Sequence, residues 1–140
     1  MLPYDYVTYG QELTDYLKTA SAKPAAHGLD FAFALAAAAR FTQAATDIRS
    51  QQLHPPANPA ALNLALRSVE TAFLSSSGLP NRPWYKHAIY APGEFTGYAA
   101  VDIPGVNEAL DANNPTTAAQ QLTILTNAIN LAATNLESAR

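Results

Sequence analysis

The chain has 140 residues, of which 49% are hydrophobic and 14% charged, with a formal net charge of −3 and no cysteine. This length and composition favour one globular domain, so we expect residues 1–140 to form a single domain with its own core. The acidic balance argues against a nucleic-acid partner, because such binding needs clustered lysine and arginine. The lack of cysteine excludes disulfides, thiolate metal ligands and cysteine nucleophiles.

No apolar stretch is long enough to cross a bilayer, and the first residues do not resemble a signal peptide. We therefore expect no direct membrane contact. The start of the chain fits either a cytosolic protein or a piece of a longer one.

Helical periodicity predicts a first helix over about residues 4–20, where Pro3 suits an N-terminal position. Gly10 interrupts the pattern at a cost of about 1 kcal/mol relative to alanine, and marks either a close approach by another helix or a tolerated weakness. The apolar stripe of this helix consists of Tyr6, Tyr9, Leu13, Tyr16, Leu17 and Ala20.

A second helix is expected over about residues 30–51, with Asp30 as a capping or first-turn acid. This segment is apolar around more than half of its circumference, so it should have neighbours on two sides. Its wide apolar face comprises Phe31, Phe33, Ala34, Leu35, Ala37, Ala38, Phe41, Ala44, Ala45 and Ile48.

Two Asn-Pro pairs mark the starts of two further long helices. Asn58-Pro59 opens a helix expected over residues 59–76, and Asn114-Pro115 opens one over residues 116–138. A short helix is expected just before the latter, near residues 104–110. These elements predict an all-α fold, an up-down four-helix bundle with one long extended crossover between helices three and four.

That crossover, residues 78–104, is the one long segment without a helical pattern of apolar residues, and we call it the strap. It carries four prolines, the only tryptophan and three of the seven tyrosines. A long connection without regular structure is usually functional or disordered, and a segment this rich in aromatic and aliphatic residues is not typical of disorder. We therefore expect an ordered, extended strap laid over the helices.

No catalytic or metal-binding motif stands out. His27, His54 and His87 each lack a second ligand at helical spacing, and the chain has neither a Gly-x-Ser-x-Gly sequence nor a phosphate-binding loop. We expect no catalytic residue, no metal ligand and no cofactor in this chain.

The aromatic residues of the first helix and of the strap admit two interpretations. Tyr6, Tyr9 and Tyr16 belong either to the core or to an interface, since tyrosine combines a large contact area with a polar tip. The strap residues with the same two alternatives, sealing the bundle or facing a partner, are Arg82, Trp84, Tyr85 and Tyr90.

The strap and its flanks resemble a known family. Residues 79–92 (LPNRPWYKHAIYAP), 97–99 (GYA) and 103–110 (IPGVNEAL), with the opening LPYDYVTY, are similar to the C-terminal helical domain of the transferrin receptor and glutamate carboxypeptidase II family. The resemblance covers nearly the whole chain in the right order. It implies a transferrin receptor-like dimerisation domain taken from a longer parent protein.

The resemblance also implies partners and a location. Family members are typically single-pass membrane proteins whose extracellular or lumenal part holds a zinc-peptidase-like domain, a protease-associated domain and this helical domain. The helical domain makes much of the homodimer contact and packs on the peptidase-like domain of its own chain. Any zinc is held by that peptidase-like domain. Apart from what the resemblance implies, we expect a weak or moderate dimer of this chain, to which helices one and four and their connections contribute most.

One substrate contact is implied by the resemblance. In glutamate carboxypeptidase II, a Lys-Tyr pair after the Ile-Tyr-Ala-Pro segment holds the terminal glutamate carboxylate of the substrate. Gly97 and Tyr98 occupy the matching positions, so the tyrosine is kept and the lysine is absent, which removes a charge-assisted contact. Tyr98 then supplies a hydroxyl to a different substrate, or serves only in packing.

Three functions remain open. The chain is a dimerisation and interdomain-packing module without chemistry of its own, a contributor to the substrate pocket of a parent metallocarboxypeptidase, or a free-standing four-helix adaptor beginning at Met1.

Overall fold

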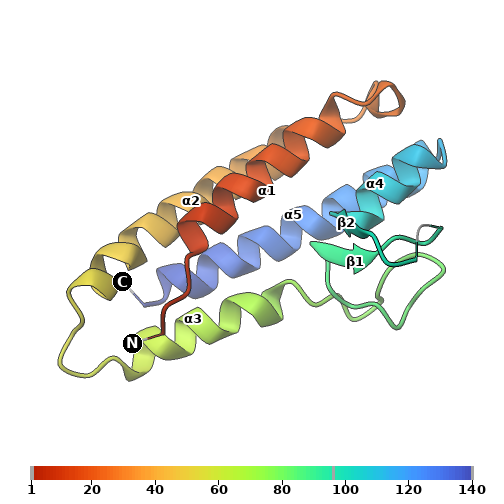
Figure 1. Cartoon of the computed structure of the whole chain (residues 1–140). Coiled ribbons are helices and arrows are strands. Elements are labelled where there is room, and N and C mark those ends of the chain that lie inside the picture. The colour runs from red at the N-terminus through yellow and green to blue at the C-terminus, as the bar shows by residue number, and fades with distance from the viewer. Residues whose placement is uncertain (1, 96, 140) are drawn as a thin grey trace.

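The computed structural model describes residues 2–95 and 97–139. This part of the chain is mostly helical, with one small antiparallel sheet inside the strap (Figure 1). The elements are α1 (Tyr6–Ser21), the 3-10 turn η1 (Pro24–Ala26), α2 (Ala32–Leu53), α3 (Ala60–Ala72), β1 (Tyr90–Pro92), β2 (Ala100–Asp102), α4 (Pro104–Asp111) and α5 (Pro115–Glu137). None of the described helices has the length and hydropathy needed to cross a membrane.

The helix α5 lies at the centre of the packing. It contacts α2, α3 and α4, while α1 packs on α2. Figure 1 shows α1 and α2 running side by side, with the strap at one end of the molecule and both chain ends at the other. Fully buried side chains from four helices form the core between them, among them Leu13, Phe41, Leu66 and Ile129.

Gly10 allows α1 to approach α2 closely. The residue is buried, and a Cβ at this position would run into Thr42 Oγ1 and crowd Phe41. The interruption of the helical pattern at Gly10 is therefore explained by a close helix–helix approach.

The helices α1 and α5 are each capped at the N-terminus by a side chain that accepts a backbone hydrogen bond. Asp5 accepts from the backbone N of Thr8 at 3.1 Å, and this bond is the main reason that the pKa of Asp5 lies below its usual value. Asn114 accepts from the backbone N of Thr117 at 3.1 Å, and Pro115 follows it at the first helical position.

The third helix ends earlier than the sequence suggests. Expected to reach residue 76, α3 stops at Ala72 because the following backbone pairs with the strap. Phe73 O accepts from the backbone N of Ala88 at 2.8 Å, and Ser75 N donates to Lys86 O at 2.8 Å. The last turn of the expected helix is thus exchanged for contacts that hold the strap.

The strap itself contains the strand pair that an all-α description lacks. Tyr90 pairs with Asp102 and Pro92 with Ala100, in antiparallel register. Ile103 then turns the chain into α4 with a φ of 38°, a conformation that β-branched residues seldom adopt, while its side chain is fully buried.

The last turn of α2 holds both ends of the described chain. Gln52 Nε2 donates to the backbone oxygens of Leu2 and Tyr4, each at 3.0 Å. Its neighbour Gln51 donates from Nε2 to Ala139 O at 3.1 Å.

Candidate functional site

The tyrosines of α1 lie largely inside the molecule. Tyr6 is buried, and its hydroxyl donates to Leu66 O at 2.8 Å. Tyr9 is half-buried and packs on the rings of Phe41 and Phe73, while its buried hydroxyl has no hydrogen-bond partner among the described residues. Burial raises the pKa of both tyrosines well above the usual value. In this chain these two side chains therefore belong mainly to the core.

Tyr16 and Tyr90 join α1 to the first strand of the strap. Their hydroxyls lie 3.2 Å apart and their rings meet edge to face. Burial, together with the hydrogen bond between the Tyr16 and Tyr90 hydroxyls, raises the pKa of Tyr90. His87 stacks on the Tyr90 ring and accepts hydrogen bonds at Nδ1 from the backbone N of Ile89 and Tyr90, at 3.2 and 3.3 Å. These contacts fix the strap to the helices.

Among residues 2–95 and 97–139, Arg82 is the only charged residue that is buried. Its Nη2 donates to both carboxylate oxygens of Glu108, at 2.7 and 2.6 Å, and its Nη1 donates to Pro92 O at 2.5 Å. The Glu108 carboxylate also accepts from the backbone N of Glu94 at 2.9 Å, and the guanidinium of Arg82 lies 5.2 Å from the centre of the Tyr85 ring. This cluster ties the first half of the strap, the end of β1 and α4 together.

The loop between the two strands presents exposed aromatic side chains. Its base is closed by a hydrogen bond of 2.9 Å from Gly93 N to Ala99 O and by the Arg82 cluster. Phe95 is 91% exposed and Tyr98 is fully exposed, and Trp84 elsewhere in the strap is also largely exposed. The hydroxyl of Tyr98 is therefore accessible to a group outside this chain.

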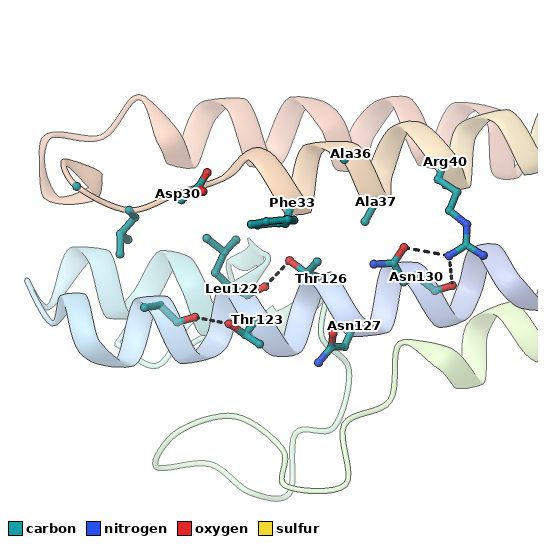
Figure 2. Close-up of a pocket in the computed structure, with 13 residues that line it drawn as sticks. Asp30, Phe33, Ala36, Ala37, Arg40, Leu122, Thr123, Thr126, Asn127 and Asn130 are labelled. Atoms are coloured by element: carbon teal, nitrogen blue, oxygen red, sulfur yellow. Dashed lines mark hydrogen bonds between the residues drawn. The ribbon is translucent and has the colours of Figure 1, made fainter.

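A groove of about 710 Å³ lies between α2 and α5. Figure 2 shows the side chains of Phe33 and Leu122 in the space between the two helices. Phe33 and Ala37 both belong to the wide apolar face expected for the second helix, but Phe33 is 76% exposed whereas Ala37 is buried. The α5 wall of the groove includes Thr123 and Thr126, and α5 carries no charged residue from Pro115 to Leu136.

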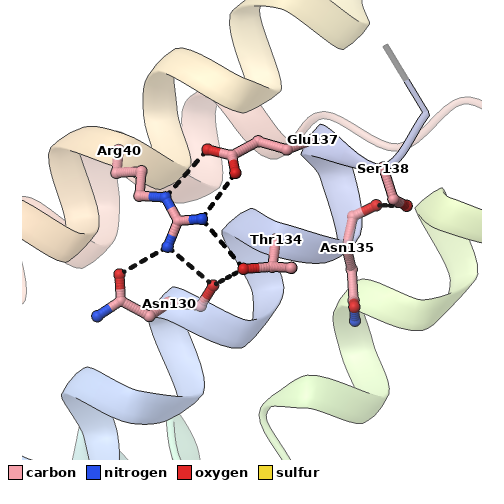
Figure 3. A network of polar contacts seen from close by, with 6 residues as sticks. All are labelled: Arg40, Asn130, Thr134, Asn135, Glu137 and Ser138. Carbon is pink, nitrogen blue, oxygen red and sulfur yellow. Dashed lines mark hydrogen bonds and ion pairs between the residues drawn. The ribbon is translucent and has the colours of Figure 1, made fainter.

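An arginine network closes one end of this groove (Figure 3). Arg40 of α2 donates from Nε and Nη2 to the carboxylate of Glu137, at 3.0 and 2.6 Å. It also donates to Asn130 Oδ1 at 3.1 Å and to Thr134 Oγ1 at 3.0 Å. The hydrogen bond with Glu137 raises the pKa of Arg40, and the pair leaves the groove without an uncompensated positive charge.

The histidines remain apart from one another. His27 and His54 are exposed in the connections on either side of α2, and His87 lies in the strap. The residues that the structure describes contain no group of three or more histidine, aspartate or glutamate side chains able to hold a metal ion.

Sequence analysis missed the groove between α2 and α5. Its signal was present in the 22 consecutive uncharged residues from Pro115 to Leu136, which contain polar residues that a fully buried helix would not carry.

Comparisons with known proteins identify the family. A family model described as the transferrin receptor-like dimerisation domain matches residues 29–137. A probable glutamate carboxypeptidase of Arthroderma benhamiae is 35% identical over 147 residues, which cover 99% of this chain and 20% of that protein. Probable glutamate carboxypeptidases of Arabidopsis thaliana and Zea mays are each 28% identical, over 79% of this chain and 17% of their own length. The chain spans about a fifth of the length of the curated relatives it matches. It belongs to the transferrin receptor-like dimerisation domain family.

Proposed function

We propose that this chain is the homodimerisation and interdomain-packing module of a larger glutamate carboxypeptidase-like protein, without a complete active site of its own. The observation that carries the proposal is the uncharged outer surface of α5 beside the exposed Phe33. The cores of protein interfaces are depleted in charged residues and enriched in aromatic ones, whereas an ordinary free surface mixes both signs of charge. The name of the family supports self-association.

The proposal takes α1, α2, α3 and α5 as an up-down four-helix bundle with the strap as its long crossover. The packing of α5 against α2 and α3, and of α1 against α2, supports this description. The second partner is the peptidase-like part of the same polypeptide, for which the exposed aromatic residues of the strap, Trp84, Phe95 and Tyr98, are available. The relatives' length, about five times that of this chain, supports such a partner.

Sedimentation equilibrium over a wide concentration range tests the self-association. We expect a reversible transition from a species of 14.9 kDa to one of twice that mass. A mass that stays at the monomer value at the highest concentration contradicts self-association by this chain.

A second function is favoured by one observation, the full exposure of Tyr98 on a loop whose base is fixed. We propose that Tyr98 contributes its hydroxyl to the substrate pocket of the parent metallocarboxypeptidase, whose zinc would be held outside this chain. Because Gly97 cannot supply a cation, the proposed contact is a hydrogen bond rather than an ion pair.

The test uses the full-length parent enzyme with the substitution Tyr98→Phe. Loss of a hydrogen bond to a charged substrate group should lower kcat/KM about tenfold or more. Tyr4→Phe is a matched control, because Tyr4 is an exposed tyrosine in the segment that leads into α1. If both variants keep the parent's kcat/KM, the pocket function of Tyr98 is wrong.

A further inference from the structure

One face of α2 is exposed and carries small or aromatic residues over two turns. Phe33 and Ala36 lie on this face at helical spacing, with Arg40 one turn further on. All three line the groove with α5. The alanine leaves room for a second helix to approach, and the phenylalanine projects a large apolar side chain beside that position.

The groove that these residues line lies on the same face. Its α5 wall runs from Ala119 to Asn130, about 16 Å along the helix axis. Small and uncharged side chains dominate this wall, so a phenyl ring can pack against it without burying an unpaired charge, whereas the carboxylate of Asp30 lines the groove on the side of α2. The exposed ring of Phe33 and the groove that it lines therefore belong to one surface.

The distribution of charge fits a contact between two identical surfaces. In a twofold dimer, each residue near the axis meets its own copy, so an unpaired charge there would repel itself. The α2 segment between Asp30 and Arg40 contains no charged residue, and neither does α5 before Glu137. Arg40 is already neutralised by the Glu137 carboxylate at 2.6 Å. The centre of the face is thus free of charge.

We propose that two copies of this chain pair through the face formed by α2 and α5, with α2 crossing its own copy near Ala36 and Phe33 of each copy entering the groove of the other. This inference rests on the proposed dimerisation and specifies its surface. It replaces the α1 contribution expected from sequence, since Tyr6 and Tyr9 are engaged in the core. Phe33 is the central aromatic anchor of such an interface.

A cross-linking experiment tests the position of the axis. The chain has no cysteine, so a single introduced thiol can pair only with its copy. A disulfide needs Cα atoms within about 7 Å, which Ala36→Cys satisfies only if α2 crosses its copy nearby. Ala61→Cys is the matched control, an exposed alanine on α3. Under mild oxidation we expect a covalent dimer for Ala36→Cys and a monomer for Ala61→Cys.

A second experiment measures the contribution of Phe33. Phe33→Lys should raise the dimer dissociation constant about 100-fold, because it removes the anchor and places like charges across the axis. Leu64→Lys, at an equally exposed leucine on α3, should leave that constant unchanged. Circular dichroism checks that both variants keep their helix content.

The outcomes separate this inference from the function on which it rests. Cross-linking through residue 36 together with weaker pairing of Phe33→Lys supports the α2–α5 face. A wild-type dimer that Phe33→Lys leaves intact, with no cross-link through residue 36, overturns the face while dimerisation stands. A wild-type monomer at all concentrations overturns both the α2–α5 face and self-association by this chain. The groove would then be a contact surface for another domain of the parent protein.

Discussion

Tyr6 and Tyr9 are neighbours on one helix face and share a core, but they differ at their hydroxyl groups. The Tyr6 hydroxyl donates to Leu66 O at 2.8 Å, whereas the buried Tyr9 hydroxyl has no partner among the described residues. Tyr6→Phe should therefore lower the free energy of unfolding by about 1 kcal/mol, while Tyr9→Phe should leave it unchanged or raise it, because no hydrogen bond is lost and a desolvated polar group is removed.

Urea unfolding followed by circular dichroism measures both variants. The two substitutions remove the same atom from the same residue type, so each serves as the control for the other. An equal loss of stability in Tyr6→Phe and Tyr9→Phe would mean that the Tyr9 hydroxyl also has a hydrogen-bond partner in solution.

The strap depends on the ion pair between Arg82 and Glu108, whose side chains are only 9% and 16% exposed. Removing one partner leaves the other charge buried and unpaired, which typically costs about 3 kcal/mol or more. Arg82→Ala should lower the free energy of unfolding by this amount. It should also speed hydrogen exchange at the backbone amide of Glu94, whose N–H donates a hydrogen bond to the Glu108 carboxylate. Arg67→Ala, at an exposed arginine on α3, should change the stability by less than about 0.5 kcal/mol.

Native-state hydrogen exchange and urea unfolding provide the two readouts. If Arg82→Ala behaves like Arg67→Ala in both, the cluster does not hold the strap. If stability falls while exchange at Glu94 is unchanged, Arg82 supports the fold without fixing the loop that bears Tyr98.

The helices of this chain could be predicted because their signals are local, whereas the details of the strap depend on tertiary contacts. The cap at Asn114 and the helical stripes mark elements that the structure contains. The strands Tyr90–Pro92 and Ala100–Asp102 are too short to show an alternating pattern, so the sequence could not reveal them. The end of α3 was misplaced because the strap residues that pair with the backbone beyond it, Lys86 and Ala88, lie more than ten residues away from their partners in sequence.

The candidate functional surfaces also divide into one that the sequence indicated and one that depends on tertiary packing. The resemblance located Tyr98, which the structure places on an exposed loop, but the groove between α2 and α5 was not foreseen. Phe33 lies within a helix that is apolar on most sides, and periodicity alone cannot decide which part of so wide a face is covered. Only the packing of the neighbouring helices settles which residues stay exposed.

The stability of the whole molecule should decline in alkali. A tyrosine in the unfolded chain ionises near pH 10, whereas burial keeps Tyr6, Tyr9 and Tyr90 protonated to higher pH in the folded state. Their contribution to stability is complete below that pH. Above it, the unfolded chain releases protons that the folded chain retains, so the free energy of unfolding falls by up to about 1.4 kcal/mol per pH unit for Tyr6 and for Tyr9, and by less for the partly exposed Tyr90.

Urea unfolding from neutral pH to above pH 10 measures this decline. Tyr9→Phe should show a shallower decline than the wild type, with the titration of lysines common to both. The same slope for the two proteins would show that Tyr9 ionises in the folded state as readily as in the unfolded one.

The clasp formed by Gln51 and Gln52 has a mechanical consequence. Since adjacent residues of α2 hold the backbone near Leu2 and at Ala139, tension applied between these two positions loads hydrogen bonds at a single end of the molecule. Tension in this direction would break the hydrogen bonds of Gln51 and Gln52 one after another. It would not load the long helices in shear. The strap and most of the α2–α5 face lie away from that end, so both would keep their shape while the clasp gives way.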